Sequence, residues 1–217
     1  MARCSGISKQ RVNTSTPMDH DARFQEALRR FDEENARDPN SVTVDGTPRP
    51  RELVYAEWVT EWVLRLAPNA PETLRLAARC QHLCRWMIPR NSYPMDRAGY
   101  LRWREDLKKF HAQKAGEILS EVGYSEETIA RVRELNLKKN LTGDPECQIL
   151  EDALCLVTLE YQLADLVEKT DPDKMVSILR KTWRKMSPAA REHALKLSFS
   201  EREMELIGRA LEPVPEE

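Results

Sequence analysis

The stretch DPECQILEDALCLVTLEYQLADLVEK, residues 144–169, decides the fold class of this chain. Asp144 followed by Pro145 is a typical helix start, because an Asp side chain caps free backbone N–H groups and a proline fits the first turn. Within the stretch, residues 153–159 (ALCLVTL) are apolar almost all round a helix. A helix without a polar face has to be buried, so we expect this one at the centre of a helical core.

The rest of the chain favours helices as well. Seven glycines in 217 residues, abundant Leu, Ala, Glu and Arg, and few runs of Val, Ile and Thr argue against sheet. Apolar residues recur at spacings of three and four, as on the inward face of an amphipathic helix. Ahead of the central stretch, this spacing predicts helices over residues 21–34, 52–66, 71–88, 99–122 and 125–139.

Three cap patterns predict further helices after the central stretch. They are Asp171-Pro172, Ser187-Pro188, and Ser200 with Glu203. We therefore expect an all-α protein, with one compact domain of about eight helices over residues 19–217.

Residues 38–50 predict a loop between two of these helices. They hold three prolines and the turn pair Asp45-Gly46, and only the sequence VTV at residues 42–44 suits a short extended piece. Residues 89–98 also predict a loop, because Pro89 ends the helix before it.

The first 18 residues differ in composition from the rest of the chain. They contain Arg3, Lys9 and Arg11, several Ser and Thr, and no acidic residue. We expect a disordered basic tail outside the fold. A short organelle-targeting segment, or a start site assigned upstream of Met18, would have the same composition.

Composition argues against several classes of protein. No run approaches the length of about 18 apolar residues that a transmembrane helix needs, and no signal-peptide core is present. The five cysteines are odd in number and lack paired metal-ligand spacing. A HExxH motif, a P-loop and a glycine-rich nucleotide fingerprint are all absent. We expect a cytoplasmic protein without a membrane partner.

Residues 79–114 concentrate positive charge. They carry nine Lys and Arg against three acidic residues, a net charge of +6, whereas the whole chain carries −2. Two of the four histidines and two of the five tryptophans lie in the same segment. A cationic, aromatic segment in an otherwise acidic chain predicts a site for an anion, most simply a phosphate. The candidate phosphate-binding residues are Arg79, Arg85, Arg90, Tyr93, Arg97 and Arg104.

Two histidines and two carboxylates are the candidates for chemistry. On the expected helix over residues 71–88, His82 shares a face with Arg79, and His111 lies in the inward stripe of the helix over residues 99–122. Glu151 and Asp152 immediately precede the buried run, where a carboxylate is costly unless it is paired or bound to a cation.

Two imidazoles and a carboxylate can bind a divalent metal ion. The alternative interpretation is a core histidine together with a buried ion pair between Asp152 and an arginine. Both interpretations fit the same residues.

Two blocks of this sequence resemble the family known as domain of unknown function 4202. They are ARCQHLCRWMIPRNSYPMDRAGYLRWREDLKKFHAQKAGEIL at residues 78–119 and DPECQILEDALCLVTLE at residues 144–160. The likeness covers residues 24–211 and implies a helical, single-domain protein. Some members carry the label glutamyl-tRNA synthetase. This chain has neither a Rossmann-type alternation of strands and helices nor the paired signature motifs for adenylate formation.

The order of His82, His111 and Asp152 is also similar, more loosely, to the histidine-aspartate metal phosphohydrolases, which are all-helical. That likeness implies a divergent fold of this type, with the three residues as metal ligands. The chain departs from the family pattern at Ala112, where an aspartate should follow the second histidine. Glu151 or Glu160 would then be a substitute ligand.

These observations support two hypotheses about function. In the first, the protein is a metal-dependent phosphohydrolase acting on a nucleotide or another small phosphoester. His82, His111 and Asp152 hold a divalent metal, Glu151 is the general base, and the arginines hold phosphate. In the second, the basic aromatic surface of residues 79–114 binds an anionic ligand or RNA without turnover. A purely structural adaptor is a third alternative, against which the buried carboxylates argue.

Overall fold

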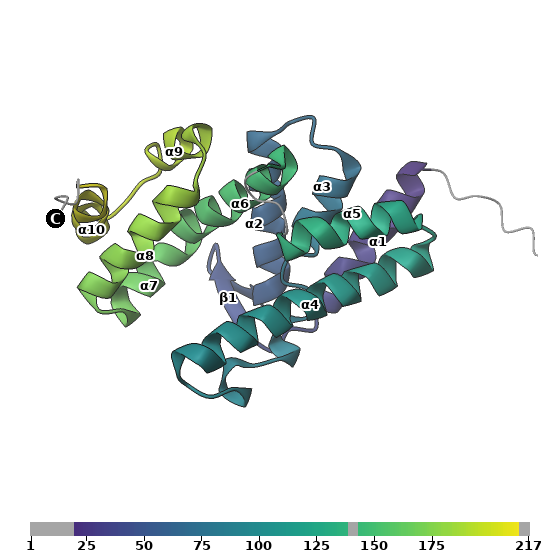
Figure 1. The fold of residues 1–217 in the computed structure, drawn as a ribbon, viewed down its shortest axis with the longest axis horizontal. Helices are drawn as coiled ribbons and strands as arrows, with labels where there is room; N and C mark the ends of the chain where they lie inside the picture. The colour runs from purple at the N-terminus through teal and green to yellow at the C-terminus, as the bar shows by residue number, and fades with distance from the viewer. Residues whose placement is uncertain (1–19, 139–142, 213–217) are drawn as a thin grey trace, which may run out of the picture.

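The computed structural model describes residues 20–138 and 143–212 (Figure 1). The tail expected over residues 1–18 lies outside the described residues, as does Lys139, the expected last residue of one helix. The α-helices are α1 (His20–Asn35), α2 (Arg51–Leu66), α3 (Glu72–Arg79), α4 (Arg97–Val122), α5 (Glu126–Leu137), α6 (Pro145–Val157), α7 (Leu163–Lys169), α8 (Pro172–Lys185), α9 (Pro188–Ala194) and α10 (Glu201–Leu211). Short 3₁₀ turns span Arg85–Met87 and Arg90–Ser92, a π-helical turn spans Thr158–Gln162, and the strands are β1 (Ser41–Val44) and β2 (Thr47–Pro50). The expected all-α class is confirmed.

Helix α6 occupies the centre of the fold. It packs against α2, α3, α5, α8 and α9, which explains why it needs no polar face. Its start is fixed as the sequence predicts: Asp144 Oδ1 accepts hydrogen bonds from the N–H groups of Glu146 and Cys147 at 3.0 and 3.3 Å. Figure 1 shows α2 and α6 in the middle, with α1, α3 and α5 on one side, α7–α10 on the other, and the long helix α4 running beneath them.

The expected extended piece is the first strand of a small hairpin. β1 pairs with β2 antiparallel, with Val42 opposite Arg49. Asp45 and Gly46 in the turn both have positive φ, 49° and 77°, as a two-residue type I′ turn requires. The second strand of the hairpin ends at Pro50, and α2 begins at the next residue.

The helix expected over residues 71–88 is wrong in its second half. α3 ends at Arg79, and residues 80–84 form a turn in which Cys84 adopts a left-handed conformation with φ of 56°. We call residues 80–84 the 80–84 turn.

Partners from distant helices hold this turn. Asn35 Oδ1 accepts the Cys84 N–H at 3.1 Å, His111 Nδ1 donates to the Leu83 carbonyl at 2.7 Å, and Gln81 Nε2 donates to Asn136 Oδ1 at 2.6 Å. The first two contacts satisfy backbone groups that a continuous helix would have paired internally, so the turn depends on partners that only the folded protein supplies.

The early end of α3 changes the position of Arg79. Its guanidinium forms two hydrogen bonds with the Asp32 carboxylate of α1, at 2.6 and 2.7 Å. Because the helix stops there, Arg79 and His82 do not share a face, and this part of the sequence prediction is corrected.

The long helix expected over residues 144–169 is also interrupted. The π-helical turn separates α6 from α7. Two contacts with α2 hold this turn: Trp62 Nε1 donates to Glu160 Oε2 at 2.7 Å, and the Tyr161 ring stacks on Trp58 with centroids 4.1 Å apart. π-Helical turns inside helices are frequent at functional sites.

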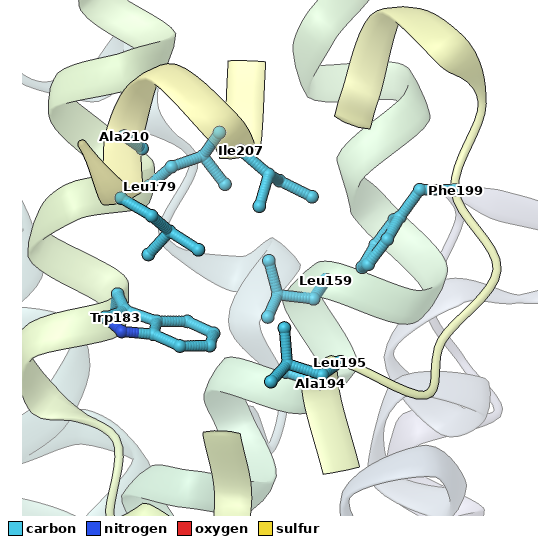
Figure 2. A pocket seen from close by; sticks show the side chains of 9 residues that line it. Leu159, Leu179, Trp183, Ala194, Leu195, Phe199, Ile207 and Ala210 are labelled. Carbon is cyan, nitrogen blue, oxygen red and sulfur yellow. The ribbon is translucent and has the colours of Figure 1, made fainter. Parts of the chain in front are cut away.

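The C-terminal helices enclose a small apolar cavity of about 30 Å³ (Figure 2). Leu159 of the π-helical turn, Leu179 and Trp183 of α8, and Ile207 of α10 point toward it. The space is about that of one water molecule in the liquid, and it offers few polar partners. We regard it as a packing gap between the C-terminal helices and the π-helical turn.

We expect Asn35→Ala to lower the free energy of unfolding by about 2 kcal/mol, because the Cys84 N–H loses its acceptor in a fully buried position. Urea unfolding followed by circular dichroism measures this change. Asn69→Ala is the matched control, since Asn69 is exposed, and its effect should stay within about 0.5 kcal/mol. Equal effects of the two substitutions would show that the Asn35 amide does not hold the 80–84 turn.

Candidate functional site

A cleft of about 380 Å³ opens between the 80–84 turn, α4, the end of α5, α6 and α8. The charged side chains that line it are Arg85, Arg104, Lys108, Lys138, Lys185 and Glu151. His82 and His111 line it as well, and Tyr55, Trp103 and Leu154 contribute apolar surface. We call this volume the cationic cleft, because the described residues that line it include five cations and one carboxylate.

Glu151 holds two of these cations in place. Its carboxylate is buried and pairs with Lys138, the residue that ends α5, and with Lys185, the last residue of α8, at 3.2 Å. Burial alone would raise the pKa of Glu151, but the two ammonium groups outweigh this effect and lower it. Glu151 is therefore ionised at neutral pH and keeps both ammonium groups beside the cleft.

The other three cations lack such a partner among the described residues. Within the part of the chain that the structure describes, Arg85, Arg104 and Lys108 form no ion pair with a carboxylate. The Arg85 guanidinium lies 5.3 Å from the centroid of the Trp103 ring, and Trp103 Nε1 donates to the Ile88 carbonyl at 2.8 Å. Arg85 is thus positioned by an anchored aromatic ring and keeps its hydrogen-bond donors available.

His111 is a neutral imidazole. The ring is 5 % exposed, and burial together with the positive surroundings lowers its pKa to about 3. Nδ1 donates to the Leu83 carbonyl, which leaves Nε2 as an acceptor.

His82 lies beside it, with the two ring centroids 5.8 Å apart. Its ring stacks on Tyr55 at 4.1 Å, and Nδ1 lies 3.3 Å from the buried carboxylate of Glu52, although this contact lacks hydrogen-bond geometry. Burial lowers the pKa of His82. Burial would raise the pKa of Glu52, but the contact with His82 and the charges of Arg85 and Arg51 lower it.

The structure brings together five of the residues that the sequence selected: His82, His111, Glu151, Arg85 and Arg104. Asp152 does not line the cleft. Its Oδ1 accepts hydrogen bonds from Gln148 Nε2 and from the Ser187 N–H, both at 2.9 Å, and so ties α6 to the start of α9. Glu151 and Asp152 are neighbours in sequence, but successive residues on a helix point about 100° apart, so the two carboxylates serve different sides of α6.

Four further selected residues lie outside the cationic cleft. Arg79 pairs with Asp32 of α1. Arg90 donates to backbone carbonyls, among them that of Pro94 at 2.7 Å, and Tyr93 donates to Asp106 at 2.8 Å. Arg97, the first residue of α4, is exposed.

Sequence reasoning missed three cations of the cleft: Lys108, Lys138 and Lys185. Lys108 follows Arg104 by four residues and precedes His111 by three, so helical spacing on α4 could have found it. No comparable spacing links Lys138 or Lys185 to the other cleft residues, because the ends of α5 and α8 are brought to α6 by the tertiary structure.

The described residues do not form a metal site with three protein ligands. Over residues 20–138 and 143–212, no group of three or more His, Cys, Asp or Glu side chains is arranged to hold one. The two imidazoles lie close together, but Glu151 is engaged by lysines and Asp152 faces α9. The described donor set therefore falls short of a three-ligand centre.

The fold and the cleft define an all-α protein with a concave cationic site. Residues 25–207 match the family described as Domain of unknown function (DUF4202). The chain belongs to this family, which confirms the resemblance seen in the two sequence blocks. Comparisons with curated proteins and with solved structures give no match. No helix of the described residues is long and apolar enough to cross a membrane.

We expect His111 to make the protein less stable as the pH falls. The unfolded chain takes up a proton near the ordinary histidine pKa of 6.5, whereas folded His111 does so only near pH 3. Between these values the unfolded state binds more protons, so unfolding becomes easier as the pH drops, by at most about 1.4 kcal/mol per pH unit from this group.

His111→Gln tests this expectation, because the amide can still donate to the Leu83 carbonyl but does not titrate. Urea unfolding at pH 7.5, 6 and 5 in the presence of EDTA should give a shallower pH dependence for the variant. The carboxylates titrate in both proteins and cancel in the comparison. Parallel pH profiles would contradict the assignment of a neutral, buried His111.

Proposed function

We propose that this protein binds a small phosphorylated ligand in the cationic cleft. The observation that carries the proposal is the set of three cations, Arg85, Arg104 and Lys108, that have no carboxylate partner among the described residues, beside two further lysines held by Glu151. Cations gathered in one concave site repel one another in the free protein. A ligand with several anionic oxygens relieves this repulsion and accepts their hydrogen bonds.

The donors of the cleft suit phosphate for geometric reasons. Arginine presents a planar fork that can hold two phosphate oxygens, whereas lysine supplies a compact charge. Arg104 and Lys108 are one turn apart on α4, and Lys138 and Lys185 come from two other elements, the end of α5 and the end of α8. Phosphate oxygens between these groups would be contacted from several directions.

In this proposal Glu151 positions the two lysines rather than acting as a general base. Its ion pairs hold the carboxylate in the ionised state. The neutral histidines can accept hydrogen bonds at Nε2 from hydroxyl groups of the ligand, since Nδ1 of His111 is already used.

The size of the cleft favours a small ligand over RNA. Its volume of about 380 Å³ lies within the range of small-molecule sites, about 300–1,000 Å³. RNA binding would instead draw on exposed basic residues of α4 outside the cleft, such as Arg97, Arg102 and Lys109.

Lys108→Gln should weaken the binding of pyrophosphate about tenfold or more, because a hydrogen bond between charged groups is worth about 1.5–3 kcal/mol. Isothermal titration calorimetry at constant ionic strength measures the change in Kd. Lys109→Gln is the matched control: Lys109 is adjacent and exposed, does not line the cleft and pairs with Glu105 at 3.8 Å. Its Kd should change less than about twofold.

A second pair of variants separates the cleft from the outer surface. Arg104→Gln should weaken pyrophosphate binding, and Arg102→Gln should leave it nearly unchanged. If Lys109→Gln and Arg102→Gln weaken binding as strongly as the cleft variants do, and if RNA binds with a steep salt dependence, RNA binding by the outer surface replaces this proposal.

Metal-dependent phosphoester hydrolysis is the second candidate function. One observation favours it: His111 Nδ1 donates to a backbone carbonyl and His82 Nδ1 lies against a buried carboxylate, as in histidines that bind metals through Nε2. Among the described residues, no third protein ligand joins these two histidines to complete a metal site.

We expect pyrophosphate to bind equally well with and without EDTA, since protein cations supply the positive charge. Calorimetry in both buffers measures this. Elemental analysis of protein purified without a chelator or a histidine tag is the companion measurement. About one transition metal per chain, lost in His82→Ala together with pyrophosphate binding, would favour the second candidate instead.

A further inference from the structure

A second cleft, of about 340 Å³, adjoins the cationic cleft. The two share four lining residues, Tyr55, Arg85, Trp103 and Gln162, so they meet along a common wall. We call the second volume the aromatic cleft, because Trp86 joins Tyr55 and Trp103 in lining it.

The charges of the aromatic cleft are largely satisfied within the protein. Arg51 lies 3.6 Å from the Glu52 carboxylate, and Arg90 donates to the carbonyls of Tyr93 and Pro94 at 3.1 and 2.7 Å. The Arg85 guanidinium, on the shared wall, forms no ion pair or hydrogen bond among the described residues, although its charge contributes to the lowered pKa of Glu52. Positive charge available to a ligand therefore decreases from the cationic cleft to the aromatic one.

Two side-chain amides complete the aromatic cleft. Gln162 ends the π-helical turn, with φ of −120° and ψ of −13° that depart from helical values, and its amide makes no hydrogen bond within the described residues. Asn40 Nδ2 donates to Asp38 Oδ1 at 2.7 Å, which leaves Asn40 Oδ1 as an acceptor. An amide can both donate to and accept from the polar edge of a planar heterocycle.

From this arrangement we infer that the ligand is a nucleotide, with its phosphates in the cationic cleft and its base in the aromatic cleft. The inference rests on the proposed function and adds the identity of the non-phosphate part. Trp86, which is only partly buried, offers a ring on which a base can stack, and the two amides can hydrogen-bond to the base edge. Arg85 lies at the border, where a nucleotide's first phosphate would be.

The test compares the affinities of phosphorylated ligands with and without a base. Isothermal titration calorimetry of the full chain uses pyrophosphate, ribose 5-phosphate, and the monophosphates and diphosphates of adenosine, guanosine, cytidine and uridine. We expect at least one nucleoside monophosphate to bind about tenfold or more tightly than ribose 5-phosphate, because only the nucleotide fills both clefts.

Trp86→Leu should reduce this advantage to less than about threefold and change the Kd of pyrophosphate by less than about twofold, since Trp86 lines only the aromatic cleft. Trp183→Leu is the matched control, because Trp183 is also partly buried but lines the apolar cavity of the C-terminal helices and neither of the two clefts. Circular dichroism checks that both variants fold. If Trp86→Leu does not fold, the wild-type comparison alone decides.

The outcomes separate the two proposals. If pyrophosphate binds but no nucleotide binds more tightly than ribose 5-phosphate, the nucleotide inference is overturned and the proposed function stands. A loss of pyrophosphate affinity in Trp86→Leu equal to the loss for nucleotides also overturns it, because the effect would not depend on the base. If neither pyrophosphate nor any nucleotide binds, both proposals fail.

Discussion

The 80–84 turn is the feature on which the candidate site depends. Asn35 from α1, His111 from α4 and Asn136 from α5 each bind a polar group of this turn. Their hydrogen bonds hold the non-helical turn that follows α3, and this turn places His82 and Arg85 at the cationic cleft. His111 thus contributes to the fold through Nδ1 and to the cleft through the rest of its ring. A substitution that disturbs this turn would therefore also disturb the cationic cleft.

Electrostatics sets the second constraint. A carboxylate as buried as Glu151 would be unfavourable alone, and two lysines that line the same cleft would repel each other. Together they form a network in which one negative charge fixes two positive ones. The remaining cations, Arg85 among them, are held by packing or lie on α4 without a carboxylate partner among the described residues. The cationic cleft therefore carries a net positive charge, and this charge is the basis of the proposal that it binds an anionic ligand.

Much of the fold could be predicted from local patterns, whereas the site could be predicted only in part. The apolar run at residues 153–159 and the cap at Asp144 predicted the central helix, because both depend on neighbours within one or two turns. Lys108 could have been found from its helical spacing to His111. The end of α3 at Arg79 could not, since its cause is hydrogen bonding from residues about 30 to 55 positions away.

The sequence by itself determined the all-α class, the buried central helix, the caps of the later helices and the concentration of positive charge in residues 79–114. These properties follow from composition and short-range spacing. Only the tertiary structure decided which charges meet: it directed Arg79 to Asp32 and Asp152 to α9, and it brought Lys138 and Lys185 to Glu151. The physical reason is that side-chain partners across a helical core are chosen by how the helices pack, and packing joins residues that no local pattern relates.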